Sequence, residues 1–585
     1  MNIFEQIPVP NIKRNSFNLS HERKFTMEMG KLIPILCQPV VPGDTAKGAS
    51  EVMIRFAPML APIMHRVDCY VHYFFVPNRL VWDNFRTFIT GGEDGMQEPA
   101  LPFIGSTAWN YAKGNDDNPL FGTSSLWDYM GLPTASDLPT IDDTNPGGSV
   151  HVSILPFKAY QLIYNEYYRD QNLTEPVEIH KDIDGLHTLS QVKEILTIRH
   201  RSWKKDYFTG ALPFPQRGED VMLPLHGDAP LQGTAFSFPN ASSQAAANVY
   251  KNTAFAELVS LYPSGHTMET VTSNPEFGNG TINVLGNSAV QQITQSSGQD
   301  TAAVATAINP NWKYTTNLSG SNAYADLSAV TAATINELRR AVALQTFLER
   351  SARGGNRYIE YLLSHFGVKS SDARLQRPEY LGGGVMPVVI SEVLQNSASS
   401  ETSPQGNLSG HGIAVGKSHK FKAYFEEHGY VIGILSVIPR ATYQQGIPRD
   451  FLKMDRFDWY IPAFAHLGEQ EIYNAELYAK SDNPFGLFGY TPRYSEYKYI
   501  PSSVHGDFRK NMNFWHLGRI FENTPTLSQE FMEVDEAKDG LSRIFAAEFD
   551  PTTGEERVYQ HLWCYCYNNL KMVRPMPIFG VPKIQ

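Results

Sequence analysis

The chain has 585 residues, of which 42% are hydrophobic and 12% aromatic, so it can build a sizeable core and is not a disordered protein. Its 44 glycines and 38 prolines predict many turns and long loops. The formal net charge of −11 excludes a protein that coats nucleic acid over its whole surface, so any contact with DNA must be confined to a local basic face.

The four cysteines are too few and too scattered for the disulfide framework of a secreted protein, so we expect reduced, cytoplasmic thiols. They are Cys37, Cys69, Cys564 and Cys566. The best apolar run, residues 430–439, is about half the roughly 20 residues that a membrane span needs. The N-terminal residues also lack the apolar segment of an export signal. We therefore expect neither a signal peptide nor a membrane anchor.

Residues 1–24 contain two prolines and a polar, asparagine-rich stretch, which predicts an extended N-terminal arm. Its candidate DNA-contacting side chains are Lys13, Arg14, Arg23 and Lys24. Two interpretations stay open for this arm: a solvated tail, or a segment that contacts nucleic acid or a partner.

The first predicted strands follow the arm. Residues 25–41 and 51–56 alternate between apolar and polar side chains and are joined by a turn at residues 42–44. Residues 68–76 are dense in aromatic and β-branched side chains, as in a buried strand. A short helix-like segment then ends at Gly91 and Gly92.

Residues 93–150 are rich in Gly, Pro, Asp and Asn, which predicts a surface loop. In residues 155–173, apolar side chains recur at helical spacing, and this stripe is expected to pack in the core. The stripe consists of Ala159, Leu162, Ile163 and Tyr167.

Residues 197–218 interleave basic and aromatic side chains. Cations can follow the phosphates of a single strand while rings stack on its bases, so this segment is a candidate for sequence-tolerant binding. A solvated loop with anchoring aromatic residues is the alternative. The DNA-facing candidates here are Arg199, Arg201, Lys204 and Lys205 for phosphates and Trp203 for stacking or packing.

Residues 219–331 are rich in Ala, Ser, Thr and Asn, an abrupt change that predicts an inserted surface subdomain. A capping box at Thr334 and Glu337 then opens a helix. The apolar stripe expected to face inward comprises Ile335, Leu338 and Val342, widened by Leu344, Phe347 and Leu348. A second helix is predicted at residues 358–366.

Residues 417–440 predict a β-hairpin with one half-buried and one fully buried strand. We expect the buried strand to share a sheet core with residues 68–76. Residues 451–465 and 483–501 predict long ordered loops, and residues 557–572 a late strand.

No catalytic or cofactor motif emerges, so we expect no enzyme activity and no cofactor. Residues 412–418 fall one residue short of a phosphate-binding loop and precede a strand, whereas such a loop opens a helix. His561, Cys564 and Cys566 are a weak metal signal because no second ligand pair is present, and we expect the two thiols to be buried in the core.

Several stretches resemble the major capsid protein of the Microviridae, the small single-stranded DNA phages, especially their gokushovirus-like members. They are NLSHERKFTMEMGKLIP (18–34), RFAPMLAPIMHRVDCYVHYFFVPNRLVWDNF (55–85), LPFKAYQLIYNEYYRDQNL (155–173), KKDYFTGALPFPQRG (204–218), LERSARGGNRYIEYLLSHFGVKSSDARLQRPEYLGGG (348–384) and FGYTPRYSEYKY (488–499). The resemblance is weak at residues 93–150 and 219–331.

The resemblance implies a mainly β fold, an eight-stranded antiparallel jelly roll with long loop insertions and a few helices. Residues 25–218 and 332–585 would form this shell domain, and residues 219–331 the protrusion at the threefold axes, which would touch a host receptor. It implies self-assembly of sixty copies into a T=1 icosahedral shell around circular single-stranded DNA. A small basic DNA-condensing protein is the expected partner, and the protein would be part of the virion after assembly in the bacterial cytoplasm.

A jelly-roll carbohydrate-binding protein or glycoside hydrolase is the alternative from another class. Its aromatic side chains would stack on sugars, and a hydrolase would need two carboxylates converging in one cleft.

Overall fold

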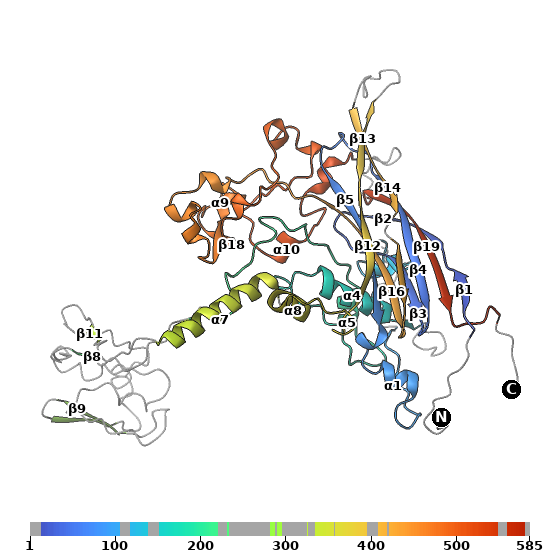
Figure 1. Cartoon of the computed structure of the whole chain (residues 1–585), viewed down its shortest axis with the longest axis horizontal. Helices are drawn as coiled ribbons and strands as arrows, with labels where there is room; N and C mark the ends of the chain where they lie inside the picture. The colour runs from blue at the N-terminus through green and yellow to red at the C-terminus, as the bar shows by residue number, and fades with distance from the viewer. Residues whose placement is uncertain are drawn as a thin grey trace. The chain divides into compact units, whose positions relative to one another are not determined.

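The computed structural model of the chain is shown in Figure 1. It describes residues 13–105, 111, 118–137, 151–219, 221, 231–232, 281–286, 289–294, 324–325, 334–355, 357–394, 408–417, 420–547 and 559–579. The chain divides into two compact units, residues 1–220 with 345–585, and residues 221–344. Among the described residues, no helix has the length and apolar character needed to cross a membrane.

One sheet of the first unit has seven antiparallel strands. They are β1 (Asn15–Asn18), β2 (His21–Met27), β4 (Thr45–Phe56), β13 (Val389–Leu394), β14 (Leu408–Lys417), β15 (Phe421–Tyr424) and β19 (Leu562–Arg574). Strand β19 pairs with β4 on one side and with β1 and β2 on the other, and β4 also pairs with β14 and β15. The late strand predicted at residues 557–572 is therefore present as β19 and is central to this sheet.

The second sheet has four antiparallel strands in the order β12-β5-β16-β3. They are β3 (Ile33–Val40), β5 (Val67–Pro77), β12 (Glu379–Pro387) and β16 (Gly429–Pro439). Strands β5 and β16 pair along their whole length, from Gly429 opposite Pro77 to Pro439 opposite Val67. This pairing confirms the prediction that two segments far apart in the sequence share one sheet core.

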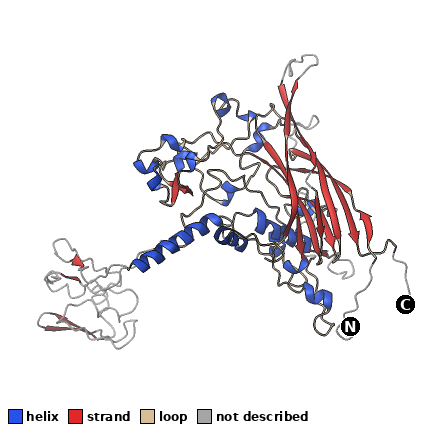
Figure 2. Ribbon diagram, in the orientation of Figure 1, coloured by secondary structure: helices blue, strands red, loops and turns tan. Residues whose placement is uncertain are grey.

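The two sheets enclose one hydrophobic core. Alternate residues of β4, such as Val52 and Ile54, are buried against residues of β5 and β16, such as Val71 and Leu435. Full burial of each such side chain contributes about 1.5–3 kcal/mol, so the shared core is a large stabilising term. Figure 2 shows the long strands gathered on one side of the unit, with most helices and loops on the other.

The four-stranded sheet is buried on its second face as well. Phe74 and Ile432 point away from the sandwich core and pack in a cluster with α3 (Leu126–Tyr129), α4 (Leu155–Ile163) and α5 (Leu189–Leu196). This double burial explains why β16 is free of charged residues. The helix predicted from residue 155 is confirmed as a core element, with a turn of π-helix at Tyr164–Tyr168 after it.

Part of the predicted surface loop at residues 93–150 is instead buried. Phe121, Leu126 and Trp127 are fully buried in the second cluster. The aromatic and aliphatic side chains of this stretch override its turn-rich composition because they cover the otherwise bare second face of the sheet.

The predicted hairpin at residues 417–440 is wrong. Both strands exist, but β15 pairs with β4 in the seven-stranded sheet, whereas β16 pairs with β3 and β5 in the other. The turn between them therefore crosses from one sheet to the other. The short turn and the two apolar runs are the same in a hairpin and in such a crossing, so local pattern did not distinguish them.

The capping box is confirmed at the start of α7 (Ile335–Gly354), because Thr334 N–H donates to Glu337 (2.7 Å) and Glu337 N–H donates to Thr334 Oγ1 (3.2 Å). Helix α8 (Tyr358–Phe366) is also confirmed. The inward orientation of the α7 stripe is wrong, since Ile335, Leu338 and Val342 are all exposed. Periodicity defines an apolar face but does not reveal whether anything covers it.

The loops of the C-terminal half are ordered around a third cluster that includes Tyr207, Tyr443, Ile472 and Phe531. Their regular elements are β17 (Glu469–Tyr473), α9 (Asn474–Leu477), β18 (Leu487–Pro492) and α10 (Gln529–Met532), with 3-10 turns at Arg449–Phe451, Arg456–Asp458, Pro462–Phe464, Ser495–Tyr497, Gly506–Arg509, Asn513–Trp515 and Leu541–Ile544. The two long loops predicted at residues 451–465 and 483–501 belong to this region.

The remaining elements are short. In the first unit they are a 3-10 turn at Asn78–Leu80, α1 (Phe85–Thr90), β6 (Phe103–Ile104) and β7 (Val152–Ser153). In the second unit they are β8 (Leu231–Gln232), β9 (Thr281–Gly286), β10 (Ala289–Thr294) and β11 (Tyr324–Ala325), paired as β9 with β10 and β8 with β11. Helix α1 ends before Gly91, as predicted, and Gly91 adopts the left-handed conformation.

Candidate nucleic-acid interface

The side chains on the outward face of the seven-stranded sheet can be identified because successive residues of a strand point to opposite faces. Along β4 the even-numbered residues are buried in the sandwich core, so the odd-numbered ones point outward, and β19 alternates in register with it. The described residues on this face include Glu22, Lys24, Thr26, Lys47, Glu51, Met53, Arg55, Lys422, Tyr424, Trp563, Tyr565, Tyr567, Asn569 and Lys571. We call this set the outer sheet face.

The outer sheet face is basic although the chain is acidic. Five of the residues just named are cations and two are carboxylates, whereas the whole chain has a formal charge of −11. Lys24 lies 3.5 Å from Glu22, but both side chains are more than half exposed, so this pair contributes little to stability. The five cations are therefore available to a ligand in solution.

Aromatic rings lie among these cations. Trp563, Tyr565 and Tyr567 occupy alternate positions of β19, about 6.8 Å apart along the strand. Tyr424 on β15 is 54% exposed, and the guanidinium carbon of Arg14 lies 5.7 Å from the centre of its ring. Rings and cations on one open surface are the combination that binds single-stranded nucleic acid without sequence preference.

The predicted basic residues of the N-terminal arm divide between two environments. Lys13 and Arg14 are exposed, and Lys24 lies on the outer sheet face. Arg23 points to the other side of β2, where its guanidinium donates to Pro34 O (3.0 Å) and to Tyr129 O. Burial lowers the pKa of Arg23, and its side chain is committed to backbone carbonyls of the fold.

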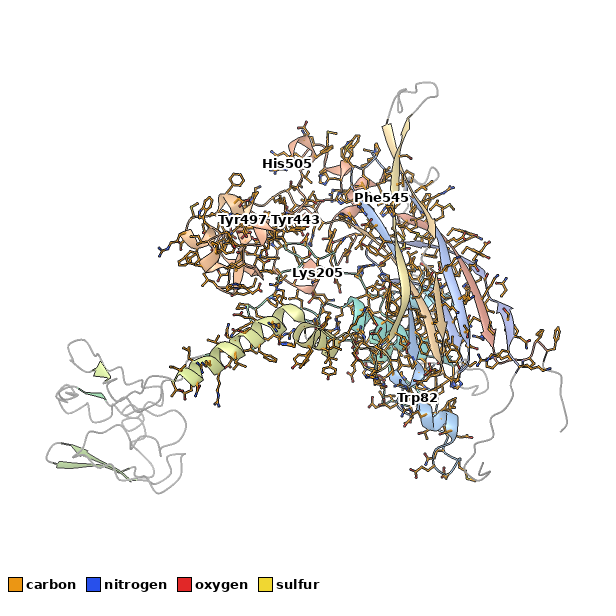
Figure 3. The ribbon with its side chains drawn as sticks, viewed as in Figure 1. Trp82, Lys205, Tyr443, Tyr497, His505 and Phe545 are labelled. Atoms are coloured by element: carbon orange, nitrogen blue, oxygen red, sulfur yellow. The ribbon has the colours of Figure 1, made fainter. Side chains whose placement is uncertain are left out.

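The predicted segment at residues 199–205 lies outside the seven-stranded sheet. Figure 3 shows Lys205 among the helices and loops, well apart from β19. Arg199 donates to Gln161 Oε1 (2.9 Å) and Glu194 O (2.9 Å). The Arg201 guanidinium lies 3.8 Å from the ring centre of Tyr70. These two arginines therefore tie elements of the fold together.

Trp203 is also part of the fold, because its side chain is 2% exposed and Arg519 lies 5.0 Å from its ring centre. Lys204 is exposed, whereas Lys205 Nζ donates to Asp170 at 2.7 Å. The structure thus leaves Lys204 and Lys205 at the surface and uses the other three candidates in packing.

Sequence inspection missed the four cations contributed by the middle of the outer sheet face, which are Lys47, Arg55, Lys422 and Lys571. Lys47, Arg55 and Lys571 each stand alone between uncharged residues, so no local cluster of charge marks them, whereas Lys422 follows Lys417 and Lys420 in the sequence. The signal that could have found three of them is alternation, since Arg55, Lys422 and Lys571 fall on the polar phase of a predicted strand. Lys47 lies between the predicted turn at residues 42–44 and the predicted strand at residues 51–56, so alternation did not mark it.

Two weak chemical signals in the sequence have structural explanations. Residues 412–417 lie in β14, where a Cβ on Gly412 would approach the Phe56 ring to 2.8 Å and one on Gly416 would approach Met386 Sδ to 2.5 Å, so both glycines leave room for packing. Cys564 and Cys566 are buried in the sandwich core beside Cys69, as predicted, and burial raises the pKa of Cys69 to about 12.

Glu178, His180 and Glu194 are the one group of potential metal ligands among the described residues, with ligand atoms within 4.8 Å of one another. The His180 ring lies 3.3 Å from Glu178 and 3.6 Å from Glu194. Direct contacts between the histidine and the two carboxylates that flank it explain why these three side chains lie close together.

Comparison with known proteins defines the class of this molecule. The family model described as "Capsid protein (F protein)" matches residues 5–584. Capsid protein VP1 of Chlamydia phage 1 is 35% identical over 100% of this chain and 98% of its own length. Capsid protein VP1 of Bdellovibrio phage phiMH2K is 35% identical over 99% of this chain and 97% of its own, and that of Spiroplasma virus 4 is 29% identical over 98% and 96%.

The protein is therefore a structural component of a virion and not an enzyme. The chain belongs to the capsid protein (F protein) family and is a major capsid protein of the Microviridae, as its resemblance predicted. Membership of this family implies self-assembly into a capsid, and it removes the carbohydrate-binding and glycoside hydrolase alternative.

Proposed function

We propose that sixty copies of the chain form a T=1 icosahedral shell and that the outer sheet face lines its lumen, against circular single-stranded DNA. The observation that carries this proposal is the surplus of cations, interleaved with aromatic rings, on one open face of a protein with a net charge of −11. Phosphates attract the cations, and unpaired bases can stack on the rings.

The strand order supports an eight-stranded jelly roll as the shell wall. One sheet contains the order β2-β19-β4 followed by β14 and β15, and the other the order β3-β16-β5-β12. Strands β14 and β15 both pair with β4 and are taken as one broken strand, with β13 as an added hairpin partner of β14. The eight main strands are then β2, β3, β4, β5, β12, the β14–β15 strand, β16 and β19, and they pair first with eighth, second with seventh, third with sixth and fourth with fifth. A long antiparallel hairpin rolled into two sheets gives this set of pairs.

Contacts between subunits are proposed for the loops between residues 449 and 501. This stretch exposes apolar side chains to an extent unusual for a soluble monomer, with Phe451 76%, Met454 81% and Ile500 85% exposed. A second copy of the chain is the occupant that capsid assembly provides.

Three further partners belong to this proposal. A small basic protein would condense the DNA, because a chain with a charge of −11 neutralises little of a genome. Residues 219–331, most of which lie outside the described residues, would form the threefold protrusion and contact a host receptor. Within residues 199–205, Lys204 and Lys205 stay candidates for DNA contact, as do Lys13, Arg14 and Lys24.

A reconstruction of particles purified from expressing bacteria tests the proposal. We expect uniform closed shells in which the outward side chains of β4 and β19 face the lumen. Shells with that face on the exterior would overturn the placement of the DNA interface but not the capsid function. Deleting residues 230–325 should leave assembly intact and reduce attachment to the host, and unchanged attachment would contradict the receptor role.

A further inference from the structure

Three lysines stand side by side across neighbouring strands of the outer sheet face. Lys571 on β19 is directly opposite Lys47 on β4, and Lys47 is directly opposite Lys422 on β15. All three side chains are exposed. We call Lys571, Lys47 and Lys422 the lysine row.

The lysine row is electrostatically unfavourable in the protein alone. Directly opposite side chains have Cβ atoms about 4.5–5.5 Å apart, and like charges in such a pair repel each other. In the described part of the chain, no salt bridge involves any of the three lysines. Glu51, on the same face of β4, is four residues from Lys47, or about 13 Å along the strand.

A buried carboxylate three residues before Lys47 in the sequence does not balance the charge of the row. Asp44, at the end of the turn before β4, is fully buried and lies 3.3 Å from Arg574. Its charge is therefore already matched. Three adjacent cations that form no salt bridge with any described residue, held on a rigid sheet, are complementary to an extended polyanion.

Aromatic contacts beside the lysine row narrow the class of polyanion. Tyr424 lies two residues beyond Lys422 on the same face of β15, and Arg14 approaches its ring. An exposed ring next to a row of cations offers a stacking surface for an unpaired base, which an acidic peptide does not require. Asn18, directly opposite Lys571, extends the row with a hydrogen-bonding side chain.

We propose that the lysine row is a binding site for the phosphodiester backbone of single-stranded DNA, which crosses the strands of the sheet with a base against Tyr424. With strands about 4.8 Å apart, the outer two lysines are about 10 Å apart at their Cα atoms, so the row contacts consecutive phosphates. The site deepens the proposed function, because it rests on the outer sheet face being the DNA-lining surface.

The test compares full-length wild-type protein with the triple variant K47Q/K422Q/K571Q by fluorescence anisotropy, with a labelled oligothymidylate as the probe. In single strands each phosphate contact contributes about 0.7 to the slope of log affinity against log salt, so the triple variant should lose about 2 from that slope. The matched control is K369Q/K480Q/K510Q, which removes three exposed lysines outside the sheet and should leave the slope unchanged.

A second readout separates binding from a structural role. Without DNA, the triple variant should unfold at a higher temperature than the wild type, because it lacks the repulsion within the row. A lower unfolding temperature combined with an unchanged salt slope would overturn the proposal and make the lysines structural. Should the triple variant not fold, K47Q alone should lower the slope by about 0.7.

Failure of this proposal is distinguishable from failure of the proposed function. DNA-filled shells from the triple variant with a wild-type salt slope would overturn the lysine row and leave the capsid function standing. Labelled polyglutamate can be tested in the same assay. If the three substitutions weaken its binding and leave oligothymidylate binding unaffected, the row is assigned to an acidic protein partner instead.

Discussion

Arg449 and Glu476 form an ion pair 2.8 Å apart beneath the exposed aromatic loops, with 7% and 2% of their side chains exposed. The Tyr207 hydroxyl donates to the same carboxylate at 2.8 Å, and Arg449 also donates to Glu471 O at 3.0 Å. One buried pair thus joins the segment after Trp203, the 3-10 turn at Arg449–Phe451 and helix α9. The loops proposed to meet a neighbouring subunit are held in place by this pair.

Glu476→Gln should destabilise the protein by about 3 kcal/mol, because it leaves the buried Arg449 guanidinium without its main counter-charge. The measurement is the free energy of unfolding in urea, followed by tryptophan fluorescence. Glu530→Gln is the matched control, since the Glu530–Lys538 pair is exposed on both sides and its loss should cost less than about 0.5 kcal/mol. Equal effects of the two substitutions would contradict an anchoring role for the pair.

Ile500→Asp should weaken assembly and leave the folding of the single chain unchanged. Ile500 is 85% exposed in one copy, so a charge there costs little until a second subunit covers it. Sedimentation of assembled particles against free protein measures the effect. Met96→Asp, at a side chain that is 84% exposed outside the loops at residues 449–501, is the control and should assemble normally. Normal assembly of Ile500→Asp would remove these loops from the proposed subunit contacts.

Arg201→Gln should lower stability by about 1–2 kcal/mol and leave DNA affinity unchanged, because the planar guanidinium stacks on Tyr70 and donates to Ser436 Oγ at 2.8 Å. The alternative from the sequence, a phosphate contact by Arg201, makes the opposite prediction. A drop in oligothymidylate affinity with an unchanged melting temperature would support that alternative. Lys204→Gln serves as the comparison, since Lys204 is exposed and its substitution should not alter stability.

Acid should destabilise the protein between about pH 6.5 and pH 4. Burial is the main cause that lowers the pKa values of His65, His72 and His187, each to about 4. The unfolded chain therefore binds protons at these histidines before the folded chain does, so their contribution to stability is complete above the unfolded pKa and is lost as the pH falls through the folded one.

Urea midpoints measured across this pH range should fall with decreasing pH, and His72→Gln should make the decline shallower. His72 is a suitable site because, among the described residues, its ring forms one hydrogen bond, with the Tyr168 hydroxyl at 2.8 Å, and an amide can replace that hydrogen bond. A decline as steep in the variant as in the wild type would show that His72 does not take part.

Sequence reasoning succeeded where one segment carried the whole signal. The uncharged run of β16 and the aromatic run of β5 each required burial on both faces, so their pairing followed. It failed where the answer depended on a partner from elsewhere in the chain. The turn before β16 was taken for a hairpin because nothing local shows that β15 pairs with β4. The Ile335 stripe was placed inward because periodicity does not reveal a covering element.

The same limit applies to the candidate site. The predicted cluster at residues 199–205 is conspicuous in the sequence because its charges are adjacent, yet Arg201 and Trp203 serve packing. Lys47, Lys422 and Lys571 are far apart in the sequence and become neighbours only through the pairing of three strands. A binding surface that forms only when distant strands pair has no local motif in the sequence.

Because β19 is central to the seven-stranded sheet and comes last in the chain, that sheet cannot be completed until synthesis is nearly over. Ser50 on β4 and Asn568 on β19 share a hydrogen bond of 2.6 Å although they are 518 residues apart in the sequence. Strand β4 leaves the ribosome early and has no β19 to pair with until synthesis is nearly over, and translation proceeds at only about 5–20 residues per second. For roughly half a minute or more the nascent chain therefore carries strand edges that only its own distant end can cover, so its exposure to misfolding during synthesis follows from topology rather than from composition.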